Sequence, residues 1–363
     1  MGRTPYKNVC GKCGAVRIDE QIGLEVTPDA YIANLVAVFR ECKRILRDDG
    51  TLWVNIGDSY VSNTGDRNKV GGFQANPSDS RLQAESAMSF NKKSGDLKSK
   101  DLIGIPWMLA FALRADGWYL RQDIIWHKPN PMPESVKDRC TKSHEYIFLL
   151  SKSARYYYDN EAVKEPAKND SGWAKQAEKG KRHQHHKAGS IYLDNREECQ
   201  YGLLTAKITP DRNKRDVWTV TTKPYKGAHY ATYPPDLITP CILAGAPETC
   251  CAKCGAPYKR VVERETIWRD RPNQYTSYRE INGQPDQRKA GSQTKTTGYQ
   301  PTCDCNAGTS SGIVFDPFVG SGTTVATAIK LGRKGIGIDL NIKYLTENAR
   351  QRIADAQQQP RLI

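Results

Sequence analysis

A glycine-rich turn near the end of the chain has the residue types best suited to binding a ligand. Residues 316–324 read Asp-Pro-Phe-Val-Gly-Ser-Gly-Thr-Thr, between a predicted strand and a predicted helix. Gly320 and Gly322 allow a tight turn and let the backbone approach a ligand above the helix N-terminus. Asp339 follows the next predicted strand, where a carboxylate can accept hydrogen bonds from a ribose diol. The third glycine of the dinucleotide fingerprint is absent, so this is a different kind of turn.

Cysteine pairs are the second group of residues that could do chemistry. The chain has 11 cysteines, and thiolates in C-x-x-C and C-x-C spacing suit tetrahedral zinc. The pairs that could together supply four ligands are Cys251, Cys254, Cys303 and Cys305. They predict a structural zinc ribbon, with scattered reduced thiols as the alternative. Cys10 and Cys13 repeat the C-x-x-C form with only two ligands nearby, so that pair is either incomplete or vacant.

The charge of the chain points to a polyanionic partner. Lys and Arg number 54 against 40 Asp and Glu, a formal net charge of +14. Cationic surface gives sequence-independent affinity for nucleic acid through counterion release, although a soluble enzyme with a basic surface has the same balance. A basic stretch within 161–216 is either a solvated charged face or an insertion that faces DNA.

Composition excludes several classes of protein. Hydrophobic residues make up 38% of the chain and the mean hydropathy is −0.67. No run approaches the roughly 18 apolar residues that span a bilayer. The first residues lack the apolar core of a secretory signal, so we expect a cytoplasmic protein with reduced cysteines.

The positions of these groups depend on the elements around them. Thr27 and Pro28 predict the start of a helix whose apolar residues recur every three or four positions up to Leu46. The strand 51–56 follows it, and a helix before a buried strand is typical of an α/β unit with a parallel sheet. The polar stretch 61–100 predicts a functional flap or a disordered loop.

Order resumes after residue 100. The predicted helices lie at 106–115, 234–243, 323–331 and 343–357, and the predicted strands at 119–126, 144–151, 313–315 and 335–340. Between two of these strands lies His-Lys-Pro-Asn-Pro-Met-Pro at 127–133, and three prolines in five residues predict a rigid loop at a strand end.

The motifs in their order resemble those of DNA amino-methyltransferases, and in particular the circularly permuted group with a C-terminal S-adenosylmethionine site. The resemblance rests on 316–324, on Gly-Ile-Asp-Leu-Asn at 337–341, and on four further blocks from about Gln21 to Ala349. These blocks are Gly50–Tyr60, Asp123–Asn130, Lys142–Ile147 and His229–Pro234. The likeness therefore covers nearly the whole chain.

The resemblance implies a cofactor site and a site for a flipped target base. The residues implied at the cofactor are Asp316, Phe318, Gly320, Ser321, Gly322, Thr323, Asp339, His229, Tyr233 and Pro234. The residues implied at the base pocket are Trp126, Lys128, Asn130 and Pro131. Trp126 could instead be a core aromatic at a strand end, and Lys128 could contact phosphate.

One family motif has no counterpart in this sequence. The family carries a (Ser/Asp/Asn)-Pro-Pro-(Tyr/Phe) tetrapeptide before the Gln-Ile-Gly-Leu-Glu segment, here Gln21–Glu25, and the tetrapeptide holds the target amine. Arg-Thr-Pro-Tyr at 3–6 is the nearest approach, with one proline where two are expected. We therefore expect two strands and the catalytic loop to be missing, and the catalytic residues stay unassigned.

The sequence predicts a Rossmann-like, circularly permuted α/β methyltransferase with a basic insertion and a zinc ribbon. Its predicted segments are an incomplete N-terminal part (1–160), a basic insertion and candidate target-recognition region (161–216), a cofactor-side segment (217–249), a zinc-ribbon insertion (250–305) and a cofactor-binding part (306–363). The implied activity is methylation of an adenine or cytosine amine in double-stranded DNA.

Two alternatives remain open. The first is an inactive fragment that binds cofactor and DNA, which the missing tetrapeptide favours. The second is an RNA methyltransferase or another adenosyl-binding enzyme, which the blocks at 123–130 and 142–147 disfavour. The expected partners are double-stranded DNA, a complementary N-terminal fragment and a restriction endonuclease. Neither the recognition sequence nor the oligomeric state follows from these residues.

Overall fold

The computed structural model describes residues 13, 22–25, 27–61, 97–166, 211–223, 233–269 and 288–358. The chain divides into two compact units. The first unit joins Met1–Tyr158, Asp216–Glu248 and Ser311–Ile363, and the second joins Asp159–Arg215 and Thr249–Ser310. The basic insertion and the cysteine-rich insertion, which the sequence separates, therefore belong to one unit.

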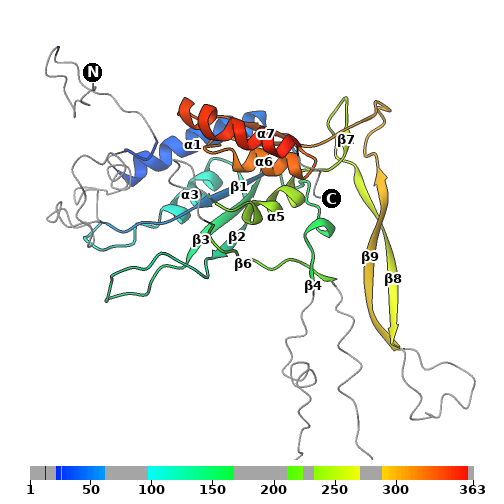
Figure 1. Ribbon diagram of the computed structural model, residues 1–363, viewed down its shortest axis with the longest axis horizontal. Helices are drawn as coiled ribbons and strands as arrows, with labels where there is room; N and C mark the ends of the chain where they lie inside the picture. The colour runs from blue at the N-terminus through cyan, green and yellow to red at the C-terminus, as the bar shows by residue number, and fades with distance from the viewer. Residues whose placement is uncertain are drawn as a thin grey trace, which may run out of the picture. The chain divides into compact units, whose positions relative to one another are not determined.

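The first unit holds a four-stranded sheet and a two-stranded one, with helices around them (Figure 1). Its helices are α1 (Pro28–Ile45), α3 (Ile105–Ala115), α5 (Pro235–Gly245), α6 (Thr323–Lys330), the π-helix η3 (Tyr344–Ala349) and α7 (Arg350–Gln358). Its strands are β1 (Thr51–Ile56), β2 (Tyr119–His127), β3 (His144–Ser151), β6 (Val217–Thr219), β11 (Ile313–Asp316) and β12 (Lys334–Gly337).

The larger sheet has the order β1-β3-β2-β6, and β11 pairs in parallel with β12. β3 runs antiparallel to both of its neighbours, while β6 is parallel to β2. The sheet is therefore mixed. The expected parallel pairing is found for β2–β6 and β11–β12, but β3 is antiparallel to both of its neighbours. The cause is the connection from β2 to β3, a proline-rich loop without the crossover helix that a parallel pair requires. Consequently the C-terminal ends of β1, β2 and β6 lie at one edge with the N-terminal end of β3.

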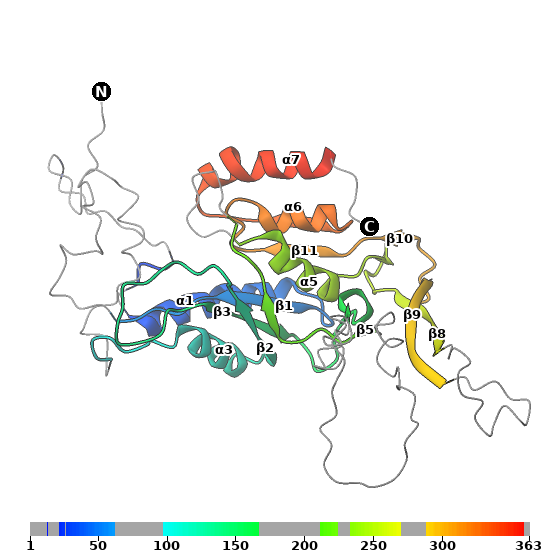
Figure 2. The same cartoon turned by 60° about the horizontal axis from the view of Figure 1, so that its bottom comes forward.

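Alternate residues of β3 belong to two hydrophobic cores on opposite faces of the sheet. Phe148 and Leu150 pack with α1 and α3 in the first core, and Ile147 packs with α5 in the second. A third core joins α5 to α6 through Ile242 and Ala328. Figure 2 shows α6 and α7 lying beside one another above β11. The larger sheet is thus covered by helices on both faces, which explains its nearly continuous apolar strands.

Helix α1 begins where the sequence predicts. The Oγ1 of Thr27 accepts a hydrogen bond of 3.2 Å from the N–H of Ala30, and Pro28 occupies the first turn. Four residues of the predicted stripe are buried: Ile32, Leu35, Phe39 and Cys42. Ile45, at the end of the stripe, is 54% exposed, because the helix runs past the edge of its core there.

Replacing Thr27 with alanine should lower the free energy of unfolding by about 1 kcal/mol, because the N–H of Ala30 loses its acceptor. Urea denaturation followed by circular dichroism measures this loss. Thr27→Ser keeps the acceptor oxygen and should stay close to the wild type. Equal losses for both variants would show that the hydroxyl does not cap the helix.

The described residues of the second unit form short strand pairs and a long hairpin. Its elements are η1 (Glu161–Val163), β4 (Glu165–Pro166), β5 (Asp211–Arg212), β7 (Cys250–Cys251), β8 (Lys259–Arg269), β9 (Arg288–Gln300) and β10 (Thr309–Ser310). β4 pairs with β5, β7 with β10 and β8 with β9, all antiparallel. The sequence predicts a polar loop between the two cysteine pairs. The structure corrects this, since β8 and β9 occupy 259–269 and 288–300 of that stretch.

Two boundaries near the C-terminus also differ from expectation. The strand predicted at 335–340 ends at Gly337, because the backbone of Ile338 bonds to Asp316 and Val319 in the glycine-rich turn. The helix predicted at 343–357 begins with the wide turns of η3 before α7. No helix in the described ranges has both the length and the apolar character that crossing a bilayer requires.

Candidate functional site

Asp316 organises the glycine-rich turn at the end of β11. Its Oδ1 accepts a hydrogen bond of 2.9 Å from the N–H of Phe318, two residues on. Its Oδ2 accepts from the hydroxyl of Tyr233 at 3.2 Å and from that of Thr324 in the first turn of α6. One carboxylate therefore holds the strand end, the turn and the helix in a fixed arrangement.

Both glycines of the turn adopt backbone conformations that favour glycine. Gly320 has φ +47° and Gly322 has φ +80°, in the left-handed region. A Cβ on Gly322 would lie 3.0 Å from the Cα and Cβ of Ala349, in η3. The glycines thus permit both the bend and the close packing of the last helix against the turn.

Asp339 closes the turn from the other side. Its Oδ2 accepts a hydrogen bond of 2.9 Å from the N–H of Gly320, and its Oδ1 accepts one of 2.7 Å from the N–H of Asn341. Each carboxylate oxygen keeps a second lone pair for a ligand hydroxyl. Asp339 is half-buried, so it shapes the turn and also offers an acceptor beside it.

Tyr233 joins the glycine-rich turn to the four-stranded sheet. Its ring packs against the core that contains Ile124 and Trp126, while its hydroxyl lies 2.5 Å from that of Thr324 and 3.2 Å from Asp316. Burial and the negative charge of Asp316 raise the pKa of Tyr233 far above its usual value. The phenol therefore stays protonated and donates. Pro234 follows directly and precedes α5.

An arginine of α7 holds the glycine-rich turn through hydrogen bonds to two of its hydroxyl groups. The Nη1 of Arg352, in α7, donates to the Oγ of Ser321 at 2.9 Å and to the Oγ1 of Thr323. Both hydroxyl residues are buried. No sequence signal points to Arg352, since it lies 29 residues after Thr323 in an ordinary helical pattern. Both hydroxyls thus accept hydrogen bonds from Arg352, and the polar groups of the turn that could bind a ligand are its backbone groups and Asp339.

Apolar side chains beside the turn are unusually exposed. Phe318 is 46% exposed and touches Phe39 of α1 edge to face, with ring centroids 6.1 Å apart. Ile338 is 54% and Leu340 85% exposed. An adenine ring could pack on such groups, because a nucleoside site combines apolar surface with a few fixed polar groups.

The proline-rich loop after β2 is fastened to the segment after β6. Asn130 accepts from the N–H of Thr222 at 3.0 Å through its Oδ1 and donates to the carbonyl of Thr222 at 3.2 Å. The Nε1 of Trp126 donates to the carbonyl of Val220 at 2.8 Å. Trp126 is only 3% exposed, so its ring has no free face for a base. We correct the stacking role on this ground, and the core alternative describes Trp126 better.

Lys128 is engaged in an ion pair at the same edge of the sheet. Its Nζ contacts Glu145 at the start of β3 and lies 4.2 Å from the centre of the Trp126 ring. Glu145 also accepts from the amide of Asn55 at 3.3 Å. The expected phosphate contact would therefore compete with Glu145. Pro131, next in the loop, is half-buried.

Asp58, just past β1, caps a distant helix. Its Oδ1 accepts from the N–H groups of Gly104 at 2.9 Å and Ile105 at 3.1 Å, at the start of α3. The Nζ of Lys142 donates to its carbonyl at 2.7 Å, and burial lowers the pKa of that lysine. The negatively charged Asp58 and the positively charged Lys142 are thus both held in place by hydrogen bonds just past the C-terminal end of β1.

The second unit brings its two cysteine pairs together. The sulfurs of Cys251, Cys254, Cys303 and Cys305 all lie within 4.8 Å of one another. Gly255, after the first pair, has φ +69°, and Asn306, after the second, has φ +48°. Each pair is therefore followed by a residue in the left-handed conformation, which turns the backbone sharply.

Backbone N–H groups of Cys254 and Lys253 lower the pKa of Cys251 to about 6, which favours its thiolate. The neighbouring thiol of Cys254 raises the pKa of Cys305 to about 12. Four sulfurs this close compete for protons, and a soft divalent cation could replace those protons.

Some predicted residues lie outside the described part of the chain. They are His229, Cys10, most of the stretch 61–100 and most of the insertion 161–216. Cys13 is exposed. The described residues contain one group of three or more metal-type ligands, the four cysteines named above.

Comparison with known proteins adds to this geometry. Residues 3–249 and 305–350 match a family model described as DNA methylase. The type II methyltransferase M.Cfr9I of Citrobacter freundii is 49% identical over 228 residues, which are 62% of this chain and 60% of that protein. M.SmaI of Serratia marcescens is 37% identical over 325 residues, 89% of this chain and 74% of that protein.

The chain thus spans about three fifths of the length of M.Cfr9I. Among solved structures, the PvuII DNA methyltransferase (cytosine-N4-specific) aligns with a TM-score of 0.43 and 11% identity, over 98% of this chain and 82% of that one. The family model leaves out 250–304, the stretch that carries the first cysteine pair and the β8–β9 hairpin.

Proposed function

The chain belongs to the DNA methylase family, and we propose on this premise that it transfers a methyl group from S-adenosylmethionine to an exocyclic amine of adenine or cytosine in duplex DNA. The observation that carries the proposal is the turn 316–324, held by Asp316 and Tyr233 and closed by Asp339. The names of the relatives, type II methyltransferases, support the same reaction.

The residues of the turn fit the cofactor. The half-buried carboxylate of Asp339 has free lone pairs for ribose hydroxyls. Phe318 and Ile338 offer apolar surface for an adenine. The left-handed conformation of Gly320 and Gly322 bends the backbone of the turn, and the methionine part could lie along this bend. Bound S-adenosylmethionine supplies an electrophilic methyl group on a positively charged sulfur.

The protein's task in this reaction is mainly to position the two reactants. A methyl group on sulfonium needs an in-line nitrogen lone pair, and holding both groups in that geometry supplies much of the rate. In this proposal Asp316 and Tyr233 hold the cofactor-binding turn in position, because they connect it to the hydrophobic core that contains Ile124 and Trp126 of β2. The loop 127–133, fastened through Asn130, lies at the end of β2 and is proposed to line the pocket of the flipped base with Pro131.

Transfer of a labelled methyl group tests the function directly. The purified chain is incubated with tritiated S-adenosylmethionine and duplex DNA, and the DNA is digested to nucleosides. We expect the label in N6-methyladenine or N4-methylcytosine. Label in 5-methylcytosine, in RNA but not DNA, or in no nucleic acid would contradict the proposal.

Replacing Asp339 with alanine should weaken S-adenosylmethionine binding by about tenfold or more, because the ribose loses a charged acceptor and the turn loses a closing bond. Isothermal titration calorimetry measures the change. Asp355→Ala, which removes an exposed carboxylate of α7, is the matched control and should bind as the wild type does. Unchanged affinity of Asp339→Ala would remove this residue from the site.

A second candidate is an inactive chain that binds cofactor and DNA. The sequence contains no (Ser/Asp/Asn)-Pro-Pro-(Tyr/Phe). In the described part, β1 pairs with β3 and β11 with β12, which leaves one edge of β1 and one of β11 unpaired. Ile336, Ile338 and Leu340 are exposed at alternate positions nearby. These features support a complementary polypeptide segment that adds strands and the amine-holding loop.

Co-expression distinguishes the two candidates. Methyl transfer by the chain alone would contradict the inactive form. The inactive form would be supported if the chain alone binds the cofactor but does not transfer the methyl group. Co-expression of a segment that supplies a strand and Ser-Pro-Pro-Tyr should then restore methyl transfer. A restriction endonuclease is the further partner we propose, and protection of cellular DNA against cleavage at the methylated site would test that pairing.

We also propose that the four cysteines bind one structural zinc ion. A tetrahedral ion with Zn–S bonds of about 2.3 Å separates its sulfurs by about 3.8 Å, and the four sulfurs lie within 4.8 Å of one another. Backbone N–H groups of Lys253 and Cys254, just before the turn at Gly255, lower the pKa of Cys251 and so favour the thiolate that zinc binds. Zinc would lock β7, β10 and the foot of β8 together.

A further inference from the structure

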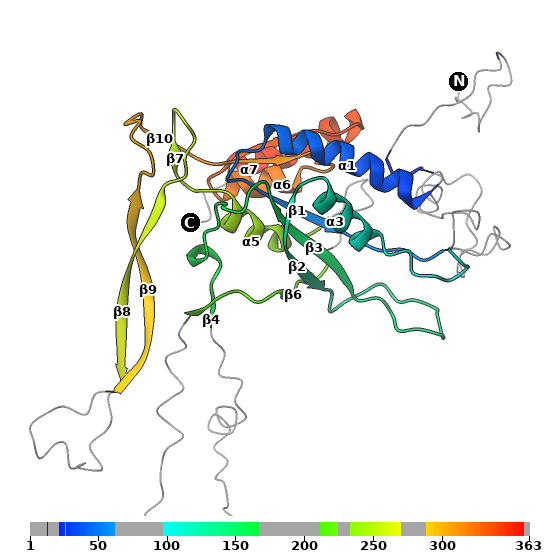
Figure 3. The same ribbon diagram turned by 180° about the vertical axis from the view of Figure 1, so that it is seen from behind.

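The β8–β9 hairpin is a ribbon of two strands that forms a sheet of its own. β8 has 11 residues and β9 has 13, and they pair along their whole length with two register shifts. Neither pairs with any other strand in the described chain. Figure 3 shows the two strands twisting around each other along their length. Within the described residues, the outer edges of β8 and β9 therefore have no strand paired to them.

Hydrophobic burial does not explain this ribbon. Most described side chains along it are exposed, including Glu263, Arg264 and Lys295, and even Val262 is 39% exposed. A two-stranded ribbon without a core is only marginally stable by itself in water. Such an element has to be supported at its base or by a ligand.

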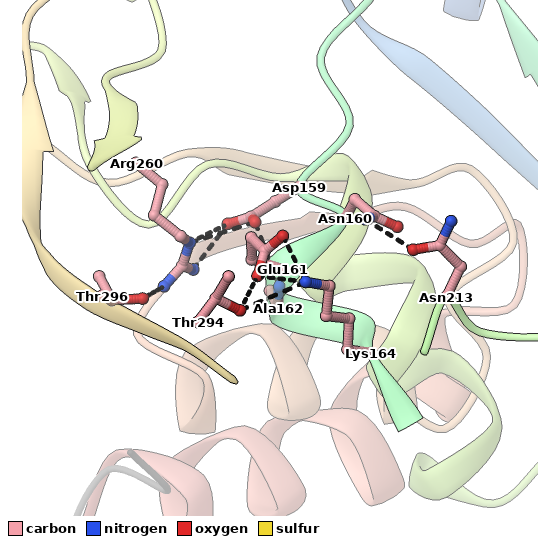
Figure 4. Close-up of polar contacts among 9 residues, drawn as sticks. All are labelled: Asp159, Asn160, Glu161, Ala162, Lys164, Asn213, Arg260, Thr294 and Thr296. Atoms are coloured by element: carbon pink, nitrogen blue, oxygen red, sulfur yellow. Dashed lines mark hydrogen bonds and ion pairs between the residues drawn. The ribbon is translucent and has the colours of Figure 1, made fainter. Parts of the chain in front are cut away.

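The base of the ribbon is supported by polar contacts (Figure 4). Arg260 donates to both carboxylate oxygens of Asp159, at 2.6 to 3.1 Å, and its Nη1 donates to the Oγ1 of Thr296 at 2.9 Å. Asp159 is buried, so this fork-like pair is largely shielded from water. Farther along, Thr294 donates to Glu161, which also pairs with Lys164.

These contacts fix one face of the ribbon near its foot. The cysteine cluster lies directly before β8 and after β9, at Cys254 and Cys303. The foot is thus fixed by two independent sets of bonds. The rest of the ribbon extends from this foot at about 3.3 Å per residue, so that β8 is roughly 36 Å long.

The ribbon is strongly basic. Its two strands contain seven Lys and Arg but only two Glu. The basic residues are Lys259, Arg260, Arg264, Arg269, Arg288, Lys289 and Lys295. Arg269 and Arg288 occupy paired register positions.

We propose that the β8–β9 ribbon enters the major groove of duplex DNA and contacts phosphates and base edges there. This inference rests on the proposed function, in which duplex DNA is the substrate. The major groove is about 12 Å wide and admits a two-stranded ribbon. The match to the family model leaves out 250–304, so the ribbon lies outside the part of the chain that matches the family. A segment of this kind could recognise the particular DNA sequence that this protein methylates.

Duplex binding by the full chain tests the ribbon. The variant Arg264→Gln/Arg269→Gln/Arg288→Gln is compared with Arg44→Gln/Arg114→Gln/Arg121→Gln, which removes three basic residues from the first unit. Fluorescence anisotropy with a labelled 30-base-pair duplex is followed between about 50 and 200 mM salt. The slope of log affinity against log salt falls by about 0.9 for each phosphate that the protein no longer neutralises.

The ribbon variant should bind about tenfold more weakly at the higher salt, with a slope reduced by about two to three, because three arginines no longer neutralise phosphates. The control should stay near the wild type. Methyl green, which occupies the major groove, should displace the wild type, and distamycin, which occupies the minor groove, should not.

The outcomes separate this inference from the proposed function. If the wild type methylates DNA and both triple variants bind alike, the ribbon inference is wrong and the function stands. If the wild type does not methylate DNA, but the ribbon variant binds the duplex more weakly than the wild type and the control does not, the proposed function is wrong and the ribbon inference stands. Absence of duplex binding by the wild type, or displacement by distamycin alone, overturns the ribbon.

Discussion

Replacing Asp316 with alanine should abolish measurable binding of S-adenosylmethionine, with a loss of at least about 100-fold in affinity. The change removes the acceptor for the N–H of Phe318 and for the hydroxyls of Tyr233 and Thr324. Donors left without a partner each cost about 1–3 kcal/mol. We therefore also expect the free energy of unfolding to fall by about 2–4 kcal/mol.

Calorimetric titration with the cofactor and urea denaturation measure the two losses separately. Asp355→Ala is the matched control, because it removes an exposed carboxylate of α7 that accepts a hydrogen bond from Gln351 on the same helix, and it should change neither quantity. Asp316→Asn keeps one acceptor oxygen and should fall between the wild type and Asp316→Ala. Wild-type affinity in a folded Asp316→Ala protein would show that the turn does not hold the cofactor.

Replacing Cys254 with serine should remove zinc from the protein and unfold the second unit. A structural zinc ion contributes about 10–16 kcal/mol to the folding of a small domain, and three thiolates hold it much less well than four. Metal analysis by mass spectrometry should find about one zinc per wild-type chain and almost none in the variant.

Cys250→Ser is the matched control for that experiment. Cys250 lies next to Cys251, but its sulfur donates to the carbonyl of Ser310 at 3.2 Å, and a serine hydroxyl can make the same bond. Hydrogen exchange should rise in β7 and β8 of Cys254→Ser only, while α1 and β3 of the first unit keep their protection. Equal zinc in the two variants, or a wild type without zinc, would contradict the metal site.

The parts of the fold that the sequence predicts well are those with local signals. The cap at Thr27, the apolar stripe of α1 and the glycines of the turn act within a few residues of each other. The four cysteines were also predicted as one group, because their knuckle spacing is itself a local geometric constraint. The two cysteine pairs lie on either side of the β8–β9 hairpin in the sequence, and the antiparallel hairpin brings them together.

The parts that the sequence did not predict depend on contacts between distant segments. The resemblance implied both Tyr233 and Asp316 at the cofactor, but not the hydrogen bond between them, which joins positions 83 apart. Asp58 caps α3 across 46 positions. Arg352 supports the turn from the last helix without any pattern that indicates it. Trp126 could not be assigned to a pocket or to the core until α5 and β6 were placed over it.

The β8–β9 ribbon was missed for a different reason. Strand prediction relies on alternation of apolar and polar residues, which arises when one face of a sheet is buried. Both faces of this ribbon are mainly polar, so the alternation is absent and the strands read as a loop. The same property, polar faces with excess positive charge, is what makes the ribbon suited to DNA.

The most direct test of the cofactor site is a crystal structure of the chain with S-adenosylhomocysteine. We predict that the ribose hydroxyls bind the carboxylate of Asp339 and that the homocysteine part lies against Gly320 and Gly322, with Tyr233 behind Asp316. S-adenosylhomocysteine bound at another place on the chain, with no contact to the turn 316–324 or to Asp339, would contradict the account.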